Sequence, residues 1–279
     1  MIVLQTIQET RSAAESARLS GKTIGFVPTM GALHEGHLSL VRQARQENDL
    51  VIVSIFVNPI QFNNPEDLKK YPRTLEKDLE MLASVQCDIV FTPSVDEMYP
   101  KSIEKTYDFG ALAEVMEGAF RPGHFNGVAV VVQRLFEITL PHKAYFGEKD
   151  FQQLQIIKAL VRIEKIEVEI VPCPISRESD GLARSSRNER LTPEMRAAAP
   201  YIQMVLREAK GLSDTHTAGQ IIRYITQKFE EHPLLKLEYF SIADEETLQP
   251  VTGPIRAGSI GFIAVFAGDI RLIDNIRLI

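Results

Sequence analysis

A continuous run of apolar and mostly β-branched residues, Leu-Val-Ile-Val-Ser-Ile-Phe-Val at 50–57, restricts the fold of this chain more than any other feature. A strand of this composition can be buried on both faces, as in the centre of a parallel sheet. Further strand-like segments alternate with segments in which apolar residues recur at helical spacing. The expected strands are 23–28, 88–91, 143–146 and 166–171, and the expected helices are 38–46, 75–85 and 151–162. This alternation predicts βαβ units and an α/β fold with a parallel sheet.

Two parts of the pattern differ from this rhythm. The segment 127–138 fits a buried helix, although its Val-Ala-Val-Val-Val run also fits a strand. After Pro174, helices are expected at 194–210 and 218–231, and strands at 234–243, 259–267 and 271–279. Helices followed by strands favour a small α+β domain. The sequence therefore predicts one domain over residues 1–174 and a second, smaller one over residues 175–279.

Charge and composition exclude several classes of protein. The chain has 31 Lys and Arg against 37 Asp and Glu, a formal net charge of −6, which argues against a nucleic-acid partner or an anionic membrane surface. No stretch is apolar enough to span a membrane, and the first residues lack the apolar core of a secretory signal. We therefore expect a cytoplasmic protein. Cys87 and Cys173 do not form a disulfide framework, so both are expected to be reduced and structural.

The segment 28–37, Pro-Thr-Met-Gly-Ala-Leu-His-Glu-Gly-His, follows the first expected strand and leads into a helix. Ligands of open α/β sheets bind at this carboxyl edge, and a helix N-terminus offers N–H groups and partial positive charge to a phosphate. Gly31 and Gly36 would let the backbone approach a ligand, and His34 and His37 would share one helix face. A nucleotide site and an ordinary helix start both remain open. Zinc is disfavoured because the helical zinc motif places its histidines four residues apart.

Two further polar segments could bind phosphate. Gly-Glu-Lys-Asp at 147–150 combines a turn, a cation and a carboxylate at the end of a strand. Lys149 would neutralise phosphate and Asp150 would bind ribose, or they are a solvated charge and a helix cap. Ser-Ser-Arg-Asn at 185–188 forms a phosphate clamp, or a polar helix entry capped by Asn188 or Thr192.

Neutral amides form the fourth group. Asn58 and Gln61 follow the strongest strand, and Gln153 lies on the helix after Asp150. Such side chains can hydrogen-bond a polar substrate in an apolar pocket. The alternatives are turn formation at Asn58-Pro59 and an exposed glutamine.

Together these motifs resemble the pantothenate synthetase (pantoate–β-alanine ligase) family. The matching segments occur between residues 26 and 191, in the order FVPTMGALHEGHLSLV, VSIFVNPIQFN, YPRTLEKDL, RPGHFNGV, FGEKDFQQL and DGLARSSRNERL. The resemblance implies a doubly wound, Rossmann-like N-terminal domain of the nucleotidyltransferase type with the His-x-Gly-His signature, which binds nucleotide and pantoate. It also implies a smaller C-terminal lid next to the dimer interface, a homodimer, and ATP with Mg²⁺.

The reaction implied by the resemblance has two halves. The carboxylate of pantoate attacks the α-phosphate of ATP and gives pantoyl adenylate and pyrophosphate. The amine of β-alanine then attacks the acyl carbon and releases AMP and pantothenate. Because no protein nucleophile is needed, catalysis rests on positioning and charge neutralisation.

The resemblance also assigns roles to residues. Those implied in catalysis are His37, as general acid or phosphate-stabilising group, with His34, Lys149 and Arg187. Those implied in ATP binding are Met30, Gly31, His34, Gly36, His37, Gly147, Lys149, Asp150, Ser176, Ser185, Ser186 and Arg187. Gln61 and Gln153 match the pantoate-binding glutamines, and Asn58 lies near that substrate pocket.

Three positions leave a question open. Ser176 stands where the family usually has an apolar residue whose backbone contacts adenine. Arg184 stands where an apolar residue usually precedes the two serines, and it either strengthens phosphate binding or points to solvent. The Mg²⁺ ligands are unknown; Asp78 is either a carboxylate near the metal or an exposed helix charge.

Other functions fit the sequence less well. Another nucleotidyltransferase with this signature would adenylate or cytidylylate a different small metabolite, but the NPIQF and GEKDFQQL segments argue against it. A tRNA-binding relative is disfavoured by the negative charge and by the lack of a basic appended domain. A non-catalytic nucleotide sensor would be expected to have lost His37, Lys149 or Arg187.

Overall fold

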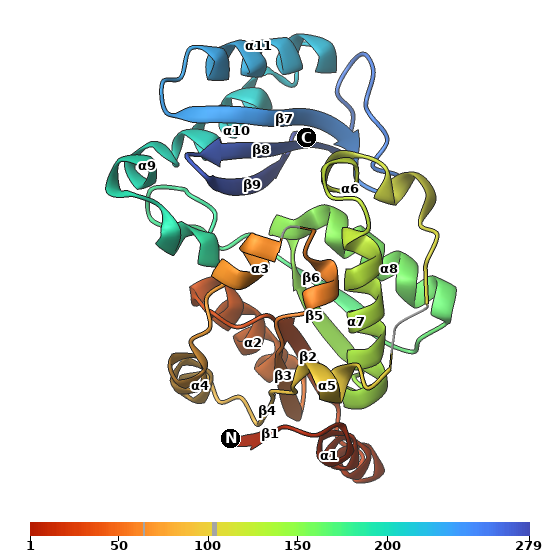
Figure 1. Cartoon of the computed structure of the whole chain (residues 1–279). Coiled ribbons are helices and arrows are strands. Elements are labelled where there is room, and N and C mark those ends of the chain that lie inside the picture. The colour runs from red at the N-terminus through yellow and green to blue at the C-terminus, as the bar shows by residue number, and fades with distance from the viewer. Residues whose placement is uncertain (64, 102–104) are drawn as a thin grey trace. The chain divides into compact units, whose positions relative to one another are not determined.

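The structure is a computed structural model that describes residues 1–63, 65–101 and 105–279 (Figure 1). These residues form two compact units. The first unit comprises residues 1–109, 121–148 and 153–174, and the second comprises 110–120, 149–152 and 175–279. The main change of unit falls at Pro174, where the sequence places the boundary. The second unit also includes the segments 110–120 and 149–152, which a single boundary at that residue does not predict.

The first unit contains a parallel sheet, as the alternation of strands and helices predicts. Within the described residues it has six strands in the order β1-β4-β3-β2-β5-β6. The strands are β1 (Ile2–Leu4), β2 (Ile24–Thr29), β3 (Leu50–Ile55), β4 (Ile89–Phe91), β5 (Lys143–Gly147) and β6 (Glu169–Cys173). The chain passes from β2 to β3 on one side and later returns to β5 on the other. The strand order therefore reverses between β2 and β5, and sheets of this kind bind ligands at the carboxyl ends of the strands on either side of such a reversal.

Helices cover both faces of this sheet (Figure 1). The helices of the first unit are α1 (Ile7–Leu19), α2 (Glu35–Glu47), α3 (Pro65–Lys70), α4 (Leu75–Ser84), α5 (Val95–Met98), α7 (His124–Thr139) and most of α8 (Phe151–Glu164). Val27 of β2 packs in one core cluster with Leu38 of α2 and Leu82 of α4. The next residue back, Phe26, meets Phe136 of α7 on the opposite face, with ring centroids 6.2 Å apart.

The segment with two open interpretations is a helix. α7 is buried along most of its length, including Val128, Val130, Val131 and Val132. Because nearly every side of the helix is covered, its sequence carries an apolar run instead of a narrow apolar stripe.

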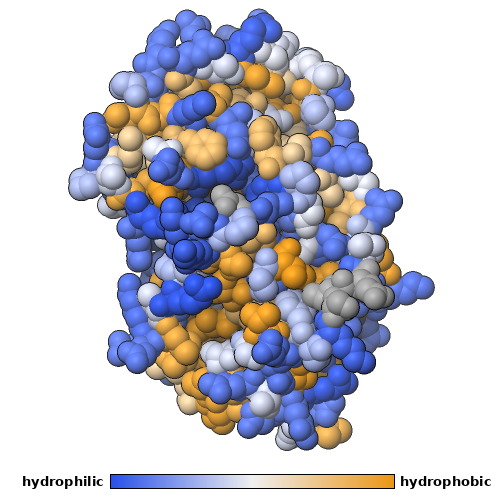
Figure 2. Space-filling model, in the orientation of Figure 1, coloured by the Kyte–Doolittle hydropathy of each residue, from blue (hydrophilic) through white to orange (hydrophobic). Residues whose placement is uncertain are grey.

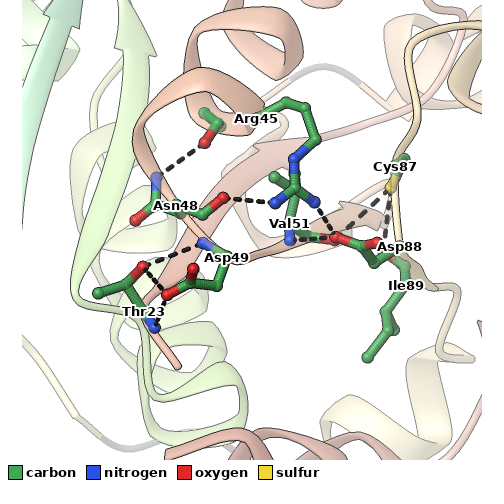
Figure 3. A network of polar contacts seen from close by, with 9 residues as sticks. Thr23, Arg45, Asn48, Asp49, Val51, Cys87, Asp88 and Ile89 are labelled. Carbon is green, nitrogen blue, oxygen red and sulfur yellow. Dashed lines mark hydrogen bonds and ion pairs between the residues drawn. The ribbon is translucent and has the colours of Figure 1, made fainter. Parts of the chain in front are cut away.

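A polar network lies at the amino ends of the central strands, at the edge opposite their carboxyl ends (Figure 3). The Asp88 carboxylate accepts from the amide of Val51 at 2.7 Å and from the Arg45 guanidinium. The Asp49 carboxylate accepts from both the amide and the hydroxyl of Thr23, each at 2.8 Å. These bonds satisfy strand ends that would otherwise leave backbone groups unpaired.

Cys87 and Cys173 are free thiols buried in the core of the first unit, as expected. The Cys87 thiol donates to the carbonyl of Ile89 at 3.2 Å. Burial raises the pKa of Cys87 to about 12 and that of Cys173 to about 12 as well. At neutral pH both side chains are therefore protonated and behave as small apolar residues.

The second unit is built on an antiparallel sheet with the strand order β7-β8-β9. Its elements are α6 (Met116–Phe120), α9 (Pro193–Ala198), α10 (Tyr201–Leu212), α11 (Ala218–Glu230), β7 (Leu235–Asp244), β8 (Ser259–Ala267) and β9 (Ile270–Arg277), with short 3-10 turns at Gly110–Ala113, Glu148–Asp150 and Ser186–Arg190. The α/β fold with a smaller α+β part is confirmed. The single helix predicted at 194–210 is wrong, because Pro200 separates α9 from α10. Proline has no N–H to donate, and its ring clashes with the preceding turn.

The two faces of this sheet pack against different elements. One face packs on α10 and α11 through residues such as Ile263 and Leu272. On the other face, Ile260 and Phe262 pack on Met116 and Phe151, which come from the segments 110–120 and 149–152. The Arg271 guanidinium also donates to the Glu117 carboxylate at 2.6 and 2.7 Å. These contacts explain why two distant segments belong to the second unit.

No helix among the described residues is long and apolar enough to cross a membrane. Figure 2 shows hydrophilic and hydrophobic residues interspersed over the face in view.

Candidate active site

The loop after β2 has an unusual backbone that a buried carboxylate holds in place. Gly31 and Ala32 have φ values of 79° and 50°, in the left-handed region that is unfavourable for alanine. The Asp78 carboxylate of α4 accepts from the amides of Ala32 at 2.9 Å and Leu33 at 2.8 Å. Asp78 is 1% exposed. The expectation of an exposed helix charge is therefore wrong, and the observed role of this carboxylate is to hold the loop that leads to α2.

The two histidines cap the helix together. His34 is the N-cap of α2, and its Nδ1 accepts from the amide of Gly36 at 3.1 Å. The Nδ1 of His37 accepts from the amide of His34 at 3.3 Å. The rings lie 4.1 Å apart between centroids. His34 therefore precedes the helix instead of sharing a helical face with His37, but the predicted proximity of the two rings is found.

These hydrogen bonds determine which nitrogen of each ring carries a proton. An Nδ1 that accepts an amide proton carries no proton, so a neutral ring has its N–H at Nε2. Each histidine can then donate a hydrogen bond from Nε2. The two rings lie at the first turn of α2, where backbone N–H groups and the helix dipole also favour an anion.

The amide residues form a buried cluster in the first unit. Asn58 and Gln61 are 1% and 8% exposed, so the alternative of an exposed glutamine is wrong. The Asn58 amide donates to Gln61 Oε1 at 3.0 Å, and the Tyr99 hydroxyl donates to Asn58 Oδ1 at 2.8 Å. Gln61 Nε2 lies 3.1 Å from the sulfur of Met30, which places the amide cluster next to the loop after β2. Gln153 lies half-buried on α8 in the same unit, outside these contacts.

Helix α7 supports this cluster through residues that the sequence did not single out. The Asn58 amide also donates to the carbonyl of Gly127 at 3.1 Å. A Cβ at Gly127 would lie 2.5 Å from the carbonyl oxygen of Ile60, so only glycine permits this close approach. Nδ1 of His124 lies 2.8 Å from the carbonyl oxygen of Gln61. The signal in the sequence is a glycine and a histidine at the start of a strongly apolar helix, two residue types that an apolar pattern alone does not call for.

Lys149 and Asp150 belong to the second unit. The Lys149 side chain is 18% exposed and its ammonium lies 3.6 Å from the Asp150 carboxylate. The carbonyl of Lys149 accepts from the side-chain amide of Asn275 at 3.0 Å. Lys149 is thus a half-buried cation paired with Asp150, and its role toward phosphate stays a prediction. Gly147, at the end of β5, belongs to the first unit.

The segment 176–188 forms a folded loop in the second unit. The amide of Arg184 donates to the carbonyl of Ser176 at 2.9 Å. The Arg184 guanidinium pairs with Glu178 at 3.1 Å and is therefore engaged within the loop, while its contribution to phosphate binding stays a prediction. Ser185 caps a 3-10 turn by accepting from the amide of Arg187 at 3.3 Å. This turn presents Ser186 and Arg187, both half-buried.

The predicted site residues therefore form two groups. The first unit holds Met30, Gly31, His34, Gly36, His37, Asn58, Gln61, Gly147 and Gln153, and Gln61 contacts Met30 there. The second unit holds Lys149, Asp150, Ser176, Ser185, Ser186 and Arg187. Within the residues described, no group of three His, Cys, Asp or Glu side chains could hold a metal ion.

Comparisons with known proteins agree on one family. Residues 2–277 match the model of the family described as pantoate-beta-alanine ligase. The pantothenate synthetase of Christiangramia forsetii is 53% identical over 280 residues, which cover 99% of this chain and 96% of that protein. The pantothenate synthetase of Porphyromonas gingivalis is 49% identical over 278 residues, which cover 99% of each chain.

Two solved structures are also similar over the whole chain. The pantothenate synthetase of Thermus thermophilus has a TM-score of 0.93 and 42% identity, covering 100% of this chain and 99% of that one. The pantoate-beta-alanine ligase of Francisella tularensis, solved in complex with beta-gamma ATP and beta-alanine, has a TM-score of 0.84 and 39% identity, covering 100% and 98%.

Proposed function

This chain belongs to the pantoate–β-alanine ligase family, and from that premise we propose how its residues carry out the ATP-dependent ligation of pantoate to β-alanine. The carboxylate of pantoate attacks the α-phosphate of ATP, pyrophosphate leaves, and the amine of β-alanine then displaces AMP from pantoyl adenylate. The observation that carries the residue-level proposal is the histidine pair at the first turn of α2. Both rings have Nε2 as the donor atom there, beside the carboxyl edge of the sheet.

We propose that ATP binds along this edge. Met30, Gly31 and Gly36 supply backbone next to the phosphates, and His34 and His37 donate from Nε2. Such donors stabilise charge that develops on phosphate oxygens, because they are already oriented before the reaction. His37 is the proposed general acid or phosphate-stabilising group, with His34 beside it. Gly147, at the end of the neighbouring strand β5, also belongs to this nucleotide site.

The remaining cations and hydroxyls that we assign to ATP belong to the second unit. We assign Lys149 to phosphate, Asp150 to ribose, and the backbone at Ser176 to adenine. Ser185, Ser186 and Arg187 form the phosphate clamp, since a guanidinium can bind two phosphate oxygens at once. The half-buried 3-10 turn that presents Arg187 supports this assignment.

Pantoate is assigned to the amide cluster. Gln61 and Gln153 would hydrogen-bond its hydroxyl and carboxylate groups, with Asn58 holding Gln61. Asn58 is fixed on both sides by Tyr99 and Gly127, which supports a positioned, low-mobility amide.

Mg²⁺ enters the proposal as part of the nucleotide, because this cation keeps several waters and is often bound through substrate phosphates. The homodimer and the cytoplasmic location implied by the family remain proposals too. The molar mass in solution tests the first and cell fractionation the second.

Isotope exchange tests the reaction class. Labelled pyrophosphate should exchange into ATP when pantoate is present and β-alanine is absent. Exchange that does not depend on pantoate would exclude pantoyl adenylate as the intermediate.

We expect Gln61→Ala and Gln153→Ala to weaken pantoate binding far more than ATP binding. Each change leaves a polar group of pantoate without its partner, which costs about 1–3 kcal/mol, or roughly 5- to 150-fold in affinity. Titration calorimetry with each ligand measures both effects. Gln46→Ala, an exposed glutamine on α2, is the control. An equal loss for ATP and pantoate would place these glutamines outside the pantoate pocket.

A second expectation concerns the proposed lid. If residues 185–187 clamp phosphates, an ATP analogue should slow amide hydrogen exchange in this turn, because ligand closure removes opening motions. Helix α11, in the same unit, should show unchanged exchange and serves as the internal control. Unchanged protection at 185–187 would contradict the clamp.

A further inference from the structure

Two consecutive residues of β9, Asp274 and Asn275, are polar yet only 4% and 5% exposed. Successive side chains of a strand point to opposite faces of its sheet. Asp274 lies opposite Ile263, whose side chain belongs to the core beneath α10 and α11, and Asn275 lies opposite Phe262 of the other face. One dipeptide therefore places a buried polar group on each side of the sheet.

Asn275 holds the segment that carries Lys149. Its side-chain amide donates to the carbonyl of Lys149 at 3.0 Å. Two aromatic contacts fix the same segment: the Phe151 ring lies 5.8 Å from that of Phe262, and the Arg277 guanidinium lies 5.5 Å from the Phe151 ring. The backbone at Lys149 is therefore attached to β9.

Asp274 holds the base of the loop that carries Arg187. Its two carboxylate oxygens accept from the Arg177 guanidinium at 2.7 and 3.0 Å. The same guanidinium donates to the carbonyl of Gly181 at 3.1 Å. Arg177 pairs with Ala183 in an antiparallel bridge, and the Asn188 amide donates to the carbonyl of Ala183 at 3.0 Å. A chain of bonds thus runs from Asp274 to the 3-10 turn that presents Arg187.

We propose that Asp274 and Asn275 are positioning residues that fix Lys149 and the 185–187 turn relative to each other, so that both cations meet the phosphates of one nucleotide. This inference rests on the proposed phosphate roles of Lys149 and Arg187. The bond from the buried Asn275 and the bidentate pair of the buried Asp274 restrict movement of the segments they hold. Such restriction matters because a misplacement of about 1 Å in a catalytic group can cost on the order of 10²-fold in rate. Neither residue touches the substrates in this proposal; each acts through the cation it positions.

The test follows the two half-reactions in double-mutant cycles. Asn275→Ala should lower the rate of pantoyl adenylate formation by about 10- to 100-fold, while the attack of β-alanine on supplied pantoyl adenylate changes much less. In a Lys149→Ala background, Asn275→Ala should add little further loss, because the group it positions is already absent. Asp274→Asn should likewise slow pantoyl adenylate formation, and in an Arg187→Ala background it should add little further loss.

Ser213→Ala is the matched control. Ser213 is a buried side chain of the second unit that also donates to a backbone carbonyl, that of Leu278 at 3.2 Å, but it belongs to neither nucleotide segment. Ser213→Ala should lose about as much stability in thermal unfolding as Asn275→Ala does, but it should keep the adenylation rate of the unchanged protein. If Asn275→Ala does not fold, Asn275→Ser, which is too short to reach Lys149, replaces it in the cycle.

The outcomes separate two kinds of failure. If Lys149→Ala and Arg187→Ala leave adenylation unchanged, the proposed phosphate roles are wrong. If Lys149→Ala and Arg187→Ala slow adenylation, but Asn275→Ala and Asp274→Asn still cause their full fold-losses in those backgrounds, the positioning role is wrong. The positioning role is also wrong if the β9 variants slow both half-reactions equally. In either case the two β9 residues serve stability alone.

Discussion

Replacing Lys149 with alanine is expected to slow pantoyl adenylate formation by about 10²–10³-fold, the usual effect of losing one donor to a charged transition state. The charge that Lys149 would neutralise grows on the phosphates only as pyrophosphate leaves. In the second half-reaction AMP leaves and the acyl carbon is attacked, so the attack of β-alanine on supplied pantoyl adenylate should slow much less. An interaction made chiefly in one transition state affects chiefly that step.

Rapid-quench measurement of each half-reaction decides the outcome. Lys236→Ala, which removes an exposed lysine of β7 in the same unit, is the control and should leave both steps unchanged. Equal slowing of both steps by Lys149→Ala would show that the lysine holds the adenylate or the fold, and the phosphate-specific role would be wrong.

Asp78→Ala is expected to cause the largest loss of stability among single changes near the site. Asp78 is buried and accepts from two backbone amides, those of Ala32 and Leu33. Leaving a buried donor without a partner costs about 1–3 kcal/mol, so the two amides together would lower the free energy of unfolding by about 2–6 kcal/mol. The left-handed backbone at Ala32 would also lose the contact that holds it, so adenylation should fall even in the folded fraction.

Denaturant unfolding and pyrophosphate exchange measure the two effects. Asp49→Ala is a matched control, because Asp49 also accepts two hydrogen bonds from one segment, the amide and hydroxyl of Thr23, but is exposed to water. Water can replace those bonds, so little stability should be lost. A comparable effect of the two substitutions would mean that the buried contacts of Asp78 are not what holds the loop.

The regular elements were predictable where a periodic pattern was long and local. The central strand β3 and the strand β8 lie close to where their apolar patterns place them. Helix α2 begins at Glu35, earlier than its apolar spacing indicates, because its cap is His34, which is not one of the usual N-cap residues. The apolar pattern does not predict helix α1, although the capping box formed by Thr6 and Glu9 marks its start.

The roles that could not be predicted depend on contacts between residues far apart in the chain. Asp78 has the local pattern of an exposed helix residue, and only the fold brings it to amides 45 and 46 residues away. Glu117 joins the second unit through Arg271, 154 residues further along. Arg184 is engaged by Glu178, a pairing that depends on how the loop closes on itself. The chemical roles of the motif residues could be proposed from the sequence, whereas the contacts that position these residues could not.

The two cysteines make the units distinguishable in a labelling experiment. Cys87 and Cys173 are the chain's entire thiol content, and both lie buried in the first unit. A thiolate-specific reagent can reach them only after that unit opens, since the folded state keeps them protonated and covered. Alkylation kinetics, followed by mass spectrometry, would therefore time the opening of the parallel-sheet unit alone. Opening of the antiparallel-sheet unit would leave the mass unchanged, so the two events can be told apart in one unmodified protein.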